Sequence, residues 1–259
     1  MTAYERVLAA RAKGRPTAMD FIESMISGFV ELHGDRRFSD DGAIVTGLGY
    51  LNHRCVTVIG LEKGHDTAEK VRRNFGSAQP EGYRKALRHM RLAEKFHRPV
   101  ICLVDTAGAA CGLGAEERGQ GLAIAENLME MMGLTVPVLS IIIGEGGSGG
   151  ALALAAANQV WMLENAVYSV LSPEGAASII WKDAKRTKEA SESLKLTAED
   201  MLSFGVIEKI IPEDQGKEQM LSDIKAALIV TLEEYCQKSG QEIRDQRYER
   251  FRKMGGMRP

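Results

Sequence analysis

The sequence predicts an α/β protein whose helices cover a largely parallel sheet. Apolar, strand-like runs alternate with helical stretches through the centre of the chain, from Val100 to Leu171. This alternation is typical of parallel pairing, because the chain must cross the sheet between one strand and the next. The 259 residues are 44% hydrophobic, which is enough for a sizeable core, and no repeat or long linker divides them. We therefore predict a single domain over residues 1–259.

The expected elements follow from the spacing of apolar residues and from the turn residues between them. In chain order they are a helix at about 17–32, strands at 43–50 and 55–61, a basic connection at 63–76, a helix at 81–96, a strand at 100–104, a helix at 115–132, a strand at 136–143, a short helix at 150–157, strands at 160–163 and 168–171, and a C-terminal helix with a polar, arginine-rich tail at about 217–259.

Each of these elements has a local signal. The first helix is indicated by apolar residues at helical spacing, beginning with Met19 and Ile22 after Pro16. The next two strands read as a hairpin that turns at Asn52, and Pro99 stops the helix at 81–96. The central strands are short, continuous apolar runs, as expected for strands that are buried on both faces. The last helix is amphipathic.

The overall composition gives no sign of a special partner. Charged residues make up 26% of the chain and the formal net charge is −2, so nothing attracts the whole molecule to nucleic acid or to an anionic membrane. The four cysteines contain no Cys-x-x-Cys pair, and no His, Asp or Glu cluster has metal-ligand spacing. No stretch approaches the roughly 18 apolar residues of a membrane span. We expect a cytoplasmic protein without a metal of its own.

The main candidate site is the glycine-rich segment Gly144-Glu-Gly-Gly-Ser-Gly-Gly150, which lies between a predicted strand and a predicted helix. Glycine permits unusual φ values and the close approach of a ligand. The first turn of a helix offers unpaired N–H groups at the positive end of a dipole. We expect such a segment to favour negative charge, either a bound phosphate or a developing oxyanion. A tight turn that serves only packing is the alternative.

Two other motifs match the same segment. Gly144, Gly146 and Gly149 satisfy G-x-G-x-x-G, and Glu164 follows at about the spacing of a dinucleotide site, although the helix between them is short for that fold. The segment also satisfies G-x-S-x-G, with Ser148 in the place of a nucleophile. All five histidines precede Ser148, which is the wrong chain order for a hydrolase of that kind. Ser148 is therefore interpreted as a turn residue.

A second glycine-bearing loop, from Asp105 to Gly114, also lies between a buried strand and a helix. Two such loops could supply N–H donors from two directions, as an oxyanion hole requires. Gly108 and Ala109 are the candidate donors here, and the alternative is that the glycines only accommodate a turn. Cys111 has no activating base beside it in the sequence, so we expect an unreactive thiol.

Positive charge is concentrated between residues 63 and 74. Arg72 and Arg73 could bind phosphates, such as those of coenzyme A, because arginine presents a fork of donors to phosphate oxygens. Acidic residues are interleaved with these cations, so a solvated, partly self-neutralised loop is the alternative.

Several segments together resemble the alpha subunits of bacterial acetyl-CoA carboxylase carboxyltransferase. They occur in that family's order and are Glu31–Arg36, Lys70–Gly76, Pro80–Ala86, Gly114–Gln120, Ile143–Ala151 and Ser172–Gly175. The resemblance implies a crotonase-like spiral of repeated strand–strand–helix turns with flanking helices. It also implies a reaction that moves a carboxyl group from carboxybiotin, held on a separate protein, to acetyl-CoA, which gives malonyl-CoA for fatty-acid biosynthesis. The expected partners are a carboxyltransferase beta subunit, in an α2β2 heterotetramer, the biotin carboxyl carrier protein and biotin carboxylase.

The resemblance also implies roles for the glycine-rich segment. Gly146 and Gly147 would donate N–H groups to the ureido oxygen of biotin. Gly144, Ser148 and Gly149 would line the same cofactor site.

One loop departs from the family pattern. The chain reads Asp105-Thr-Ala-Gly-Ala-Ala-Cys-Gly112 where relatives read Asp-Thr-Pro-Gly-Ala-Tyr-Pro-Gly. The loss of two prolines and a tyrosine removes rigidity and an aromatic wall beside the expected site. It leaves open a different acyl-CoA acceptor, such as propionyl-CoA, or a catalytically idle subunit that serves assembly.

Overall fold

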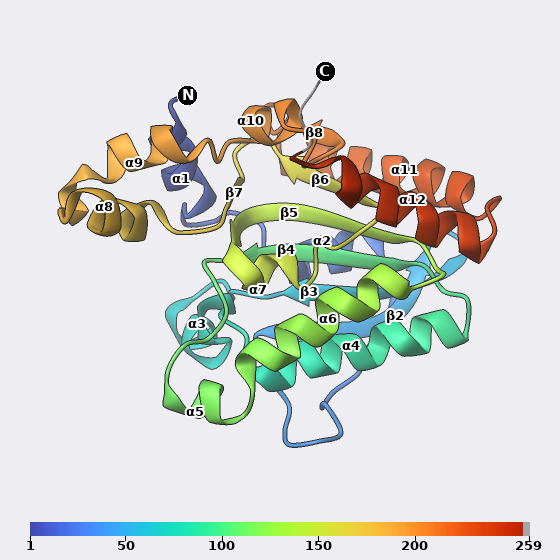
Figure 1. The fold of residues 1–259 in the computed structure, drawn as a ribbon. Coiled ribbons are helices and arrows are strands. Elements are labelled where there is room, and N and C mark those ends of the chain that lie inside the picture. The colour runs from blue at the N-terminus through green and yellow to red at the C-terminus, as the bar shows by residue number, and fades with distance from the viewer. Residues whose placement is uncertain (256–259) are drawn as a thin grey trace.

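The computed structural model describes residues 1–255, and its elements are drawn in Figure 1. The helices are α1 (Ala3–Ala10), α2 (Ala18–Met25), α3 (Thr67–Arg72), α4 (Pro80–Lys95), α5 (Leu113–Glu117), α6 (Gln120–Gly133), α7 (Ser148–Leu152), α8 (Pro173–Trp181), α9 (Thr187–Leu194), α10 (Ala198–Ser203), α11 (Lys217–Tyr235) and α12 (Gly240–Lys253). The strands are β1 (Ser27–Glu31), β2 (Ile44–Leu51), β3 (Arg54–Leu61), β4 (Val100–Thr106), β5 (Val138–Gly147), β6 (Gln159–Leu163), β7 (Val167–Ser169) and β8 (Lys209–Ile211).

The strands form one mixed sheet in the order β1-β2-β3-β4-β5-β6-β8, and β7 pairs with the end of β5. The first three strands are antiparallel, whereas the pairs from β3 onward are parallel. The predicted parallel centre and the predicted hairpin are both confirmed. In Figure 1, α4 and α6 lie side by side across one face of the sheet, while α2 lies behind the strands and contacts α11.

The buried centre of the sheet places the ends of two strands next to each other. All of β4 and almost all of β5 are buried, as expected for strands that are covered on both faces. Both strands run further than predicted, to Thr106 and Gly147, and Thr106 is in register with Gly146. The two loops that the sequence singles out therefore begin at the same edge of the sheet.

The predicted helix over 17–32 is correct only in its first half. α2 ends early, and residues 27–31 form the edge strand β1, which pairs with β2. β2 has glycines where β1 lies against it. A Cβ on Gly47 would be 2.5 Å from the Phe29 ring, and a Cβ on Gly49 would be 3.1 Å from a backbone oxygen of β1. The helical spacing of the apolar residues yields to this tertiary fit.

Other boundaries also differ from the prediction. The helix expected at 115–132 is divided into α5 and α6 at Gly119, whose backbone is left-handed (φ 79°). The helix expected at 150–157 is the shorter α7, and the strand expected at 168–171 is β7. The elements predicted from the sequence do not include α8, α9, α10 or β8. Figure 1 shows α1, α8 and α9 gathered beside the sheet, where they form small apolar clusters apart from the main core.

The arginine-rich tail is helical through Lys253, which corrects the expectation of a polar extension after α11. Its residues 256–259 lie outside the described part. α12 is anchored by Arg247, which is fully buried and donates hydrogen bonds to the carbonyl oxygens of Met131, Leu134 and Val136 at 2.8, 2.6 and 2.9 Å. No helix within residues 1–255 has the length and apolar character needed to cross a bilayer.

Candidate functional site

The glycine-rich segment is mostly strand rather than turn. β5 continues through Gly147, and Gly146 is in register with Thr106 of β4 on one side and with Tyr168 of β7 on the other. None of the five glycines in this described stretch has a positive φ, whereas Ser148 has φ 51°. The expectation that glycine supplies unusual φ values here is wrong. The change of direction falls on Ser148, as the turn-residue interpretation predicts.

Close packing explains why the segment contains glycine. A Cβ on Gly147 would lie 2.1 Å from the carbonyl oxygen of Ala107, and a Cβ on Gly150 would lie 2.5 Å from the amide nitrogen of Ala109. Atoms cannot approach so closely in a packed interior. The ends of the two loops therefore meet backbone against backbone.

The second loop has one engaged and one free candidate donor. The Gly108 N–H donates to Thr106 Oγ1 at 3.1 Å, and that hydroxyl donates in turn to the Gly108 carbonyl at 2.8 Å. The Ala109 N–H donates to no acceptor in the described part of the chain. Of the two predicted donors in this loop, Ala109 is the one that remains able to bind a ligand oxygen.

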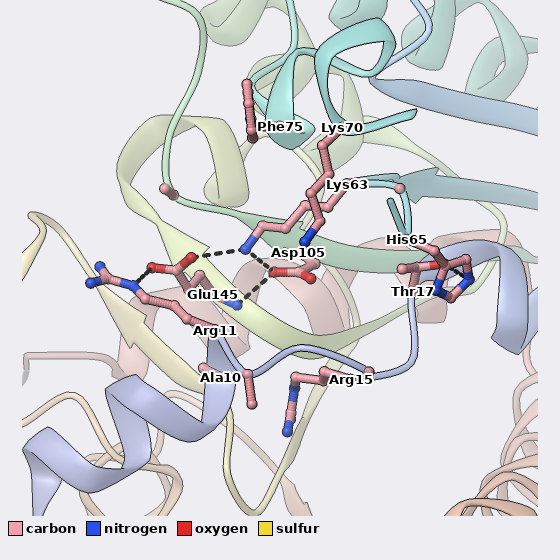
Figure 2. Close-up of a pocket in the computed structure, with 14 residues that line it drawn as sticks. Ala10, Arg11, Arg15, Thr17, Lys63, His65, Lys70, Phe75, Asp105 and Glu145 are labelled. Carbon is pink, nitrogen blue, oxygen red and sulfur yellow. Dashed lines mark hydrogen bonds and ion pairs between the residues drawn. The ribbon is translucent and has the colours of Figure 1, made fainter. Parts of the chain in front are cut away.

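A buried ionic network holds the two strand ends together (Figure 2). The Lys63 ammonium lies 2.6 Å from Asp105 Oδ1 and 2.8 Å from Glu145 Oε2. Asp105 also accepts the backbone N–H of Glu145 at 2.8 Å. From the far side, Arg11 lies 2.7 Å from Glu145 and 2.8 Å from Glu174, so the network reaches from α1 to α8. Three side chains of the network lie outside the two glycine loops in the sequence: Arg11 and Lys63 precede the loops, and Glu174 follows them.

The charges of this network stabilise one another. Burial by itself disfavours the charged form of Lys63, but the carboxylates of Asp105 and Glu145 raise the pKa of its ammonium above the ordinary value. Burial likewise opposes ionisation of Glu145, and Lys63 and Arg11 nevertheless lower the pKa of its carboxyl group. Lys63 and Glu145 are therefore both charged near neutral pH, and they act as fixed charges rather than as proton donors or acceptors.

The glycine junction lies between two cavities. One, of about 240 Å³, is lined by polar side chains that include Arg11, Lys63, His65, Asp105 and Glu145 (Figure 2). The other, of about 310 Å³, is more apolar and is lined by Ser148, Gly149, Leu152, Tyr168, Val170 and their neighbours. A small hollow lined by Gly146 and Gly147 lies beside the junction. Ala107 thus lines the polar cavity, Gly149 lines the apolar one, and Gly146 and Gly147 line the small hollow.

The two arginines that were candidates to bind phosphate differ in exposure. Arg73 is largely buried, and it donates to the carbonyl oxygen of Gly42 at 2.9 Å, so it supports the fold. Arg72 is exposed on α3, where it lies 3.3 Å from Glu69. It is Lys70, two residues before Arg72, that lines the polar cavity.

The dinucleotide and hydrolase alternatives receive no support from the surroundings. Glu164 forms an ion pair with Arg6 of α1 at 3.3 Å. The carboxylate that a dinucleotide site would need is therefore already engaged. The cavity beside Ser148 has no histidine in its lining. Among residues 1–255 there is no group of three His, Cys, Asp or Glu side chains that could hold a metal ion.

The sequence interpretation missed Lys63 and Arg11 as site residues. Asp105 and Glu145 carry a usable signal, because each is a charged residue placed in or directly after a buried apolar strand. A carboxylate in such a place needs a partner. Nothing in the sequence indicates that the partners are Lys63, after β3, and Arg11, after α1, because both contacts depend on the tertiary fold.

Comparison with known proteins agrees with this architecture. A family model described as acetyl co-enzyme A carboxylase carboxyltransferase-like matches residues 1–255. The acetyl-coenzyme A carboxylase carboxyl transferase subunit alpha of Ruminiclostridium cellulolyticum is 57% identical over 256 residues, which is 98% of each chain. A Natranaerobius thermophilus protein named for subunits beta/alpha is 54% identical over 260 residues, and this chain matches 43% of its length.

Solved structures share the fold at low sequence identity. Transcarboxylase 12S has a TM-score of 0.73 at 19% identity, over 88% of this chain and 43% of that one. The beta subunit of geranyl-CoA carboxylase from P. aeruginosa has a TM-score of 0.70 at 16% identity, over 93% of this chain and 46% of that one. This chain thus spans less than half of either structure. The predicted crotonase-type architecture is confirmed, and the chain belongs to the acetyl-CoA carboxylase carboxyltransferase-like family.

Proposed function

We propose that this chain is the alpha-type subunit of an acetyl-CoA carboxyltransferase, which moves a carboxyl group from carboxybiotin to acetyl-CoA and so forms malonyl-CoA. The junction of Gly147 with Ala107 and of Gly150 with Ala109 carries the proposal. It leaves backbone without side chains at the meeting point of two cavities, where N–H groups can face a ligand oxygen. The names of the full-length relatives support the same reaction.

The proposed reaction requires the protein to stabilise an anion. Carboxybiotin supplies the carboxyl group, and its ureido oxygen gains negative charge as that group leaves. The N–H groups of Gly146, Gly147 and Ala109 would donate to this oxygen, while Gly144, Ser148 and Gly149 would line the site. Gly144 has a tight place of its own, because a Cβ there would lie 2.3 Å from Asp105 Oδ1. Donors that the fold already holds in place need not reorganise when charge appears, which is why they lower the barrier.

Lys63 has a supporting part in this site. It ties Asp105 at the end of β4 to Glu145 at the end of β5, and thereby fixes the spacing of the loops that carry the donors. Because the ammonium is saturated by two carboxylates, it is a positioning residue and not a base.

The proposed partners are those that the family resemblance implies. A beta subunit would hold the acyl-CoA, in an α2β2 heterotetramer, and a biotin carboxyl carrier protein charged by biotin carboxylase would deliver the carboxyl group. The relative that joins beta and alpha parts in one chain supports such a pairing. Exposed Arg72 is available to the phosphates of coenzyme A, whereas Arg73 is not.

Replacing Gly147 by alanine tests the proposal. The new Cβ would displace the Ala107 carbonyl and so move the donors, and we expect malonyl-CoA formation to fall at least about a hundredfold, as when one oxyanion donor is lost. The measurement is turnover of the chain assembled with a matching beta subunit, with acetyl-CoA and a carboxylated biotin carrier supplied.

The matched control is Gly121→Ala in α6, where a Cβ meets no atom within 4 Å and alanine favours the helix. Thermal unfolding and co-purification with the beta subunit show whether Gly147→Ala is folded and assembled. A folded, assembled Gly147→Ala complex with wild-type turnover would contradict the proposal and favour the subunit that serves assembly alone.

The acceptor is tested separately, because the loop at Asp105–Gly112 departs from the family pattern. In the structure, Ala107 of this loop packs on Gly147, and Cys111 is exposed. We expect acetyl-CoA to give the highest kcat/KM in a panel of acyl-CoA acceptors. A higher value for propionyl-CoA would move the assignment to another acyl-CoA without changing the role of the glycine junction.

A further inference from the structure

A basic groove lies along α4, and it shares no residue with the cavities around the glycine junction. Its volume is about 490 Å³, within the range of small-molecule sites. One wall is the outer face of α4, and the other is the loop that joins β1 to β2, which hangs beneath α4 in Figure 1. Six cationic side chains line it, against the two carboxylates of Asp35 and Glu126. They are Arg36, Arg37, Arg84, Arg88, Arg91 and Lys95.

The cations on α4 form a stripe at a cost to the helix. Arg84, Arg88, Arg91 and Lys95 recur at steps of four, three and four residues, which places them above one another on one face. Like charges at this spacing destabilise a helix. An anion in the groove would offset that repulsion.

Some of these cations already have a carboxylate partner. Arg84 lies 2.8 Å from Asp35, Arg91 lies 2.9 Å from Glu130, and Arg37 lies 3.5 Å from Glu126. Arg36 and Arg88 have no carboxylate oxygen within 4.0 Å among residues 1–255.

The two uncompensated guanidinium groups converge on one atom. Arg36 Nη1 and Arg88 Nη2 both donate to the carbonyl oxygen of His33, at 2.9 and 3.1 Å, and Arg88 Nε donates to the carbonyl oxygen of Gly34 at 3.1 Å. Burial and the nearby charge of Arg36 lower the pKa of Arg88 by more than the charges of Asp35 and Asp40 raise it. Most of the five N–H donors of each guanidinium remain free to bind another acceptor. Two forks of donors with the same charge are thus held side by side above an open groove.

We propose that this groove binds a ligand that carries two adjacent phosphate groups, with Arg36 and Arg88 as its principal contacts. Arginine matches phosphate oxygens with paired N–H donors. A diphosphate supplies two such groups at a spacing that suits two neighbouring guanidinium groups, and its charge replaces the missing carboxylates. This proposal does not depend on the carboxyl transfer proposed for the glycine junction.

Calorimetric titration of the full-length protein with pyrophosphate tests the site. We expect saturable binding of pyrophosphate by the wild type. Its affinity should fall about tenfold in Arg36→Gln and about tenfold in Arg88→Gln, because each charge-assisted contact contributes about a factor of ten. The matched control is Arg244→Gln, which removes an exposed arginine on α12, outside the groove. The affinity of the Arg244→Gln variant for pyrophosphate should stay within about twofold of the wild-type value. Pyrophosphate should also raise the Tm of the wild type more than that of the double variant.

A parallel titration with ADP distinguishes the source of the diphosphate. Tighter binding of ADP than of pyrophosphate would identify a nucleotide, whereas equal or weaker binding would identify the diphosphate group alone, and either result supports the site. The proposal is overturned if pyrophosphate shows no saturable heat up to about 10 mM. It is also overturned if the folded double variant binds pyrophosphate as tightly as the wild type does.

Discussion

At the scale of single residues, the ends of β4 and β5 depend on one ammonium group. Lys63 is the cation that both Asp105 and Glu145 contact, and Arg11 contacts only the second of them. A buried ion pair adds little net stability, but removal of one partner leaves an uncompensated charge. The energetic importance of Lys63 therefore lies in what its loss would expose.

Replacement of Lys63 by methionine should lower the free energy of unfolding by about 3 kcal/mol, because two carboxylates then lose their main counter-ion. Urea denaturation measures the loss. Lys70→Met is the matched control, since Lys70 lines the same cavity without contacting either carboxylate, and it should change stability by less than about 0.5 kcal/mol. Equal stability of the two variants would show that Lys63 does not carry the network.

His89 gives a residue-scale prediction for the dependence of stability on pH. The ring is buried on α4, and neither ring nitrogen has a hydrogen-bond partner in the described residues. Burial, with the charges of Arg88 and Lys85, lowers the pKa of His89 to about 3. The unfolded chain takes up a proton near the ordinary value of about 6.5, so the folded state loses stability as the pH falls below that value.

Between pH 7.5 and pH 5.5 this histidine should cost the wild type about 1.4 kcal/mol of stability. His89→Leu should remove that part of the pH dependence, while the same change at exposed His53 should leave it in place. Denaturant unfolding at the two pH values measures both slopes. Parallel pH profiles for the wild type and His89→Leu would show that the folded state accommodates the charged ring.

At the scale of elements, α12 is a polar helix that one side chain fastens to the core. Arg247 reaches the carbonyl oxygens that follow α6, and burial lowers its pKa only to about 10, so it stays charged near neutral pH. It contacts carbonyl oxygens instead of a carboxylate, which spreads the charge over several dipoles. Arg247 also donates to the side-chain oxygen of Asn158, the residue directly before β6.

Arg247→Met should lower the free energy of unfolding by about 3 kcal/mol or more, because it leaves the buried carbonyl oxygens of Leu134 and Val136 without this donor. Arg244→Met on the exposed side of the same helix should cost less than about 0.5 kcal/mol. Hydrogen exchange of the α12 amides would locate the loss. If exchange in α12 matched the wild type in Arg247→Met, the helix would be held by its apolar contacts instead.

At the scale of the whole molecule, the two candidate binding surfaces share no lining residue. The glycine junction lies where the parallel strands end, which is the usual place for a ligand in a parallel sheet. The basic groove lies along α4 and the loop that precedes β2. α4 also reaches the junction, because a Cβ on Gly150 would lie 2.8 Å from the hydroxyl oxygen of its Tyr83.

The sequence by itself determined the alternating strands and helices, the hairpin and the glycine-rich strand ends. These signals are local, because each depends on the spacing of residues that are near one another in the chain. The partners of those strand ends were not predictable. Lys63 and Arg11 meet Glu145 only after β3 and α1 have been placed, and β1 is a strand only because Gly47 and Gly49 admit it. Tertiary packing decided these features, because each depends on a contact between residues that are distant in the chain.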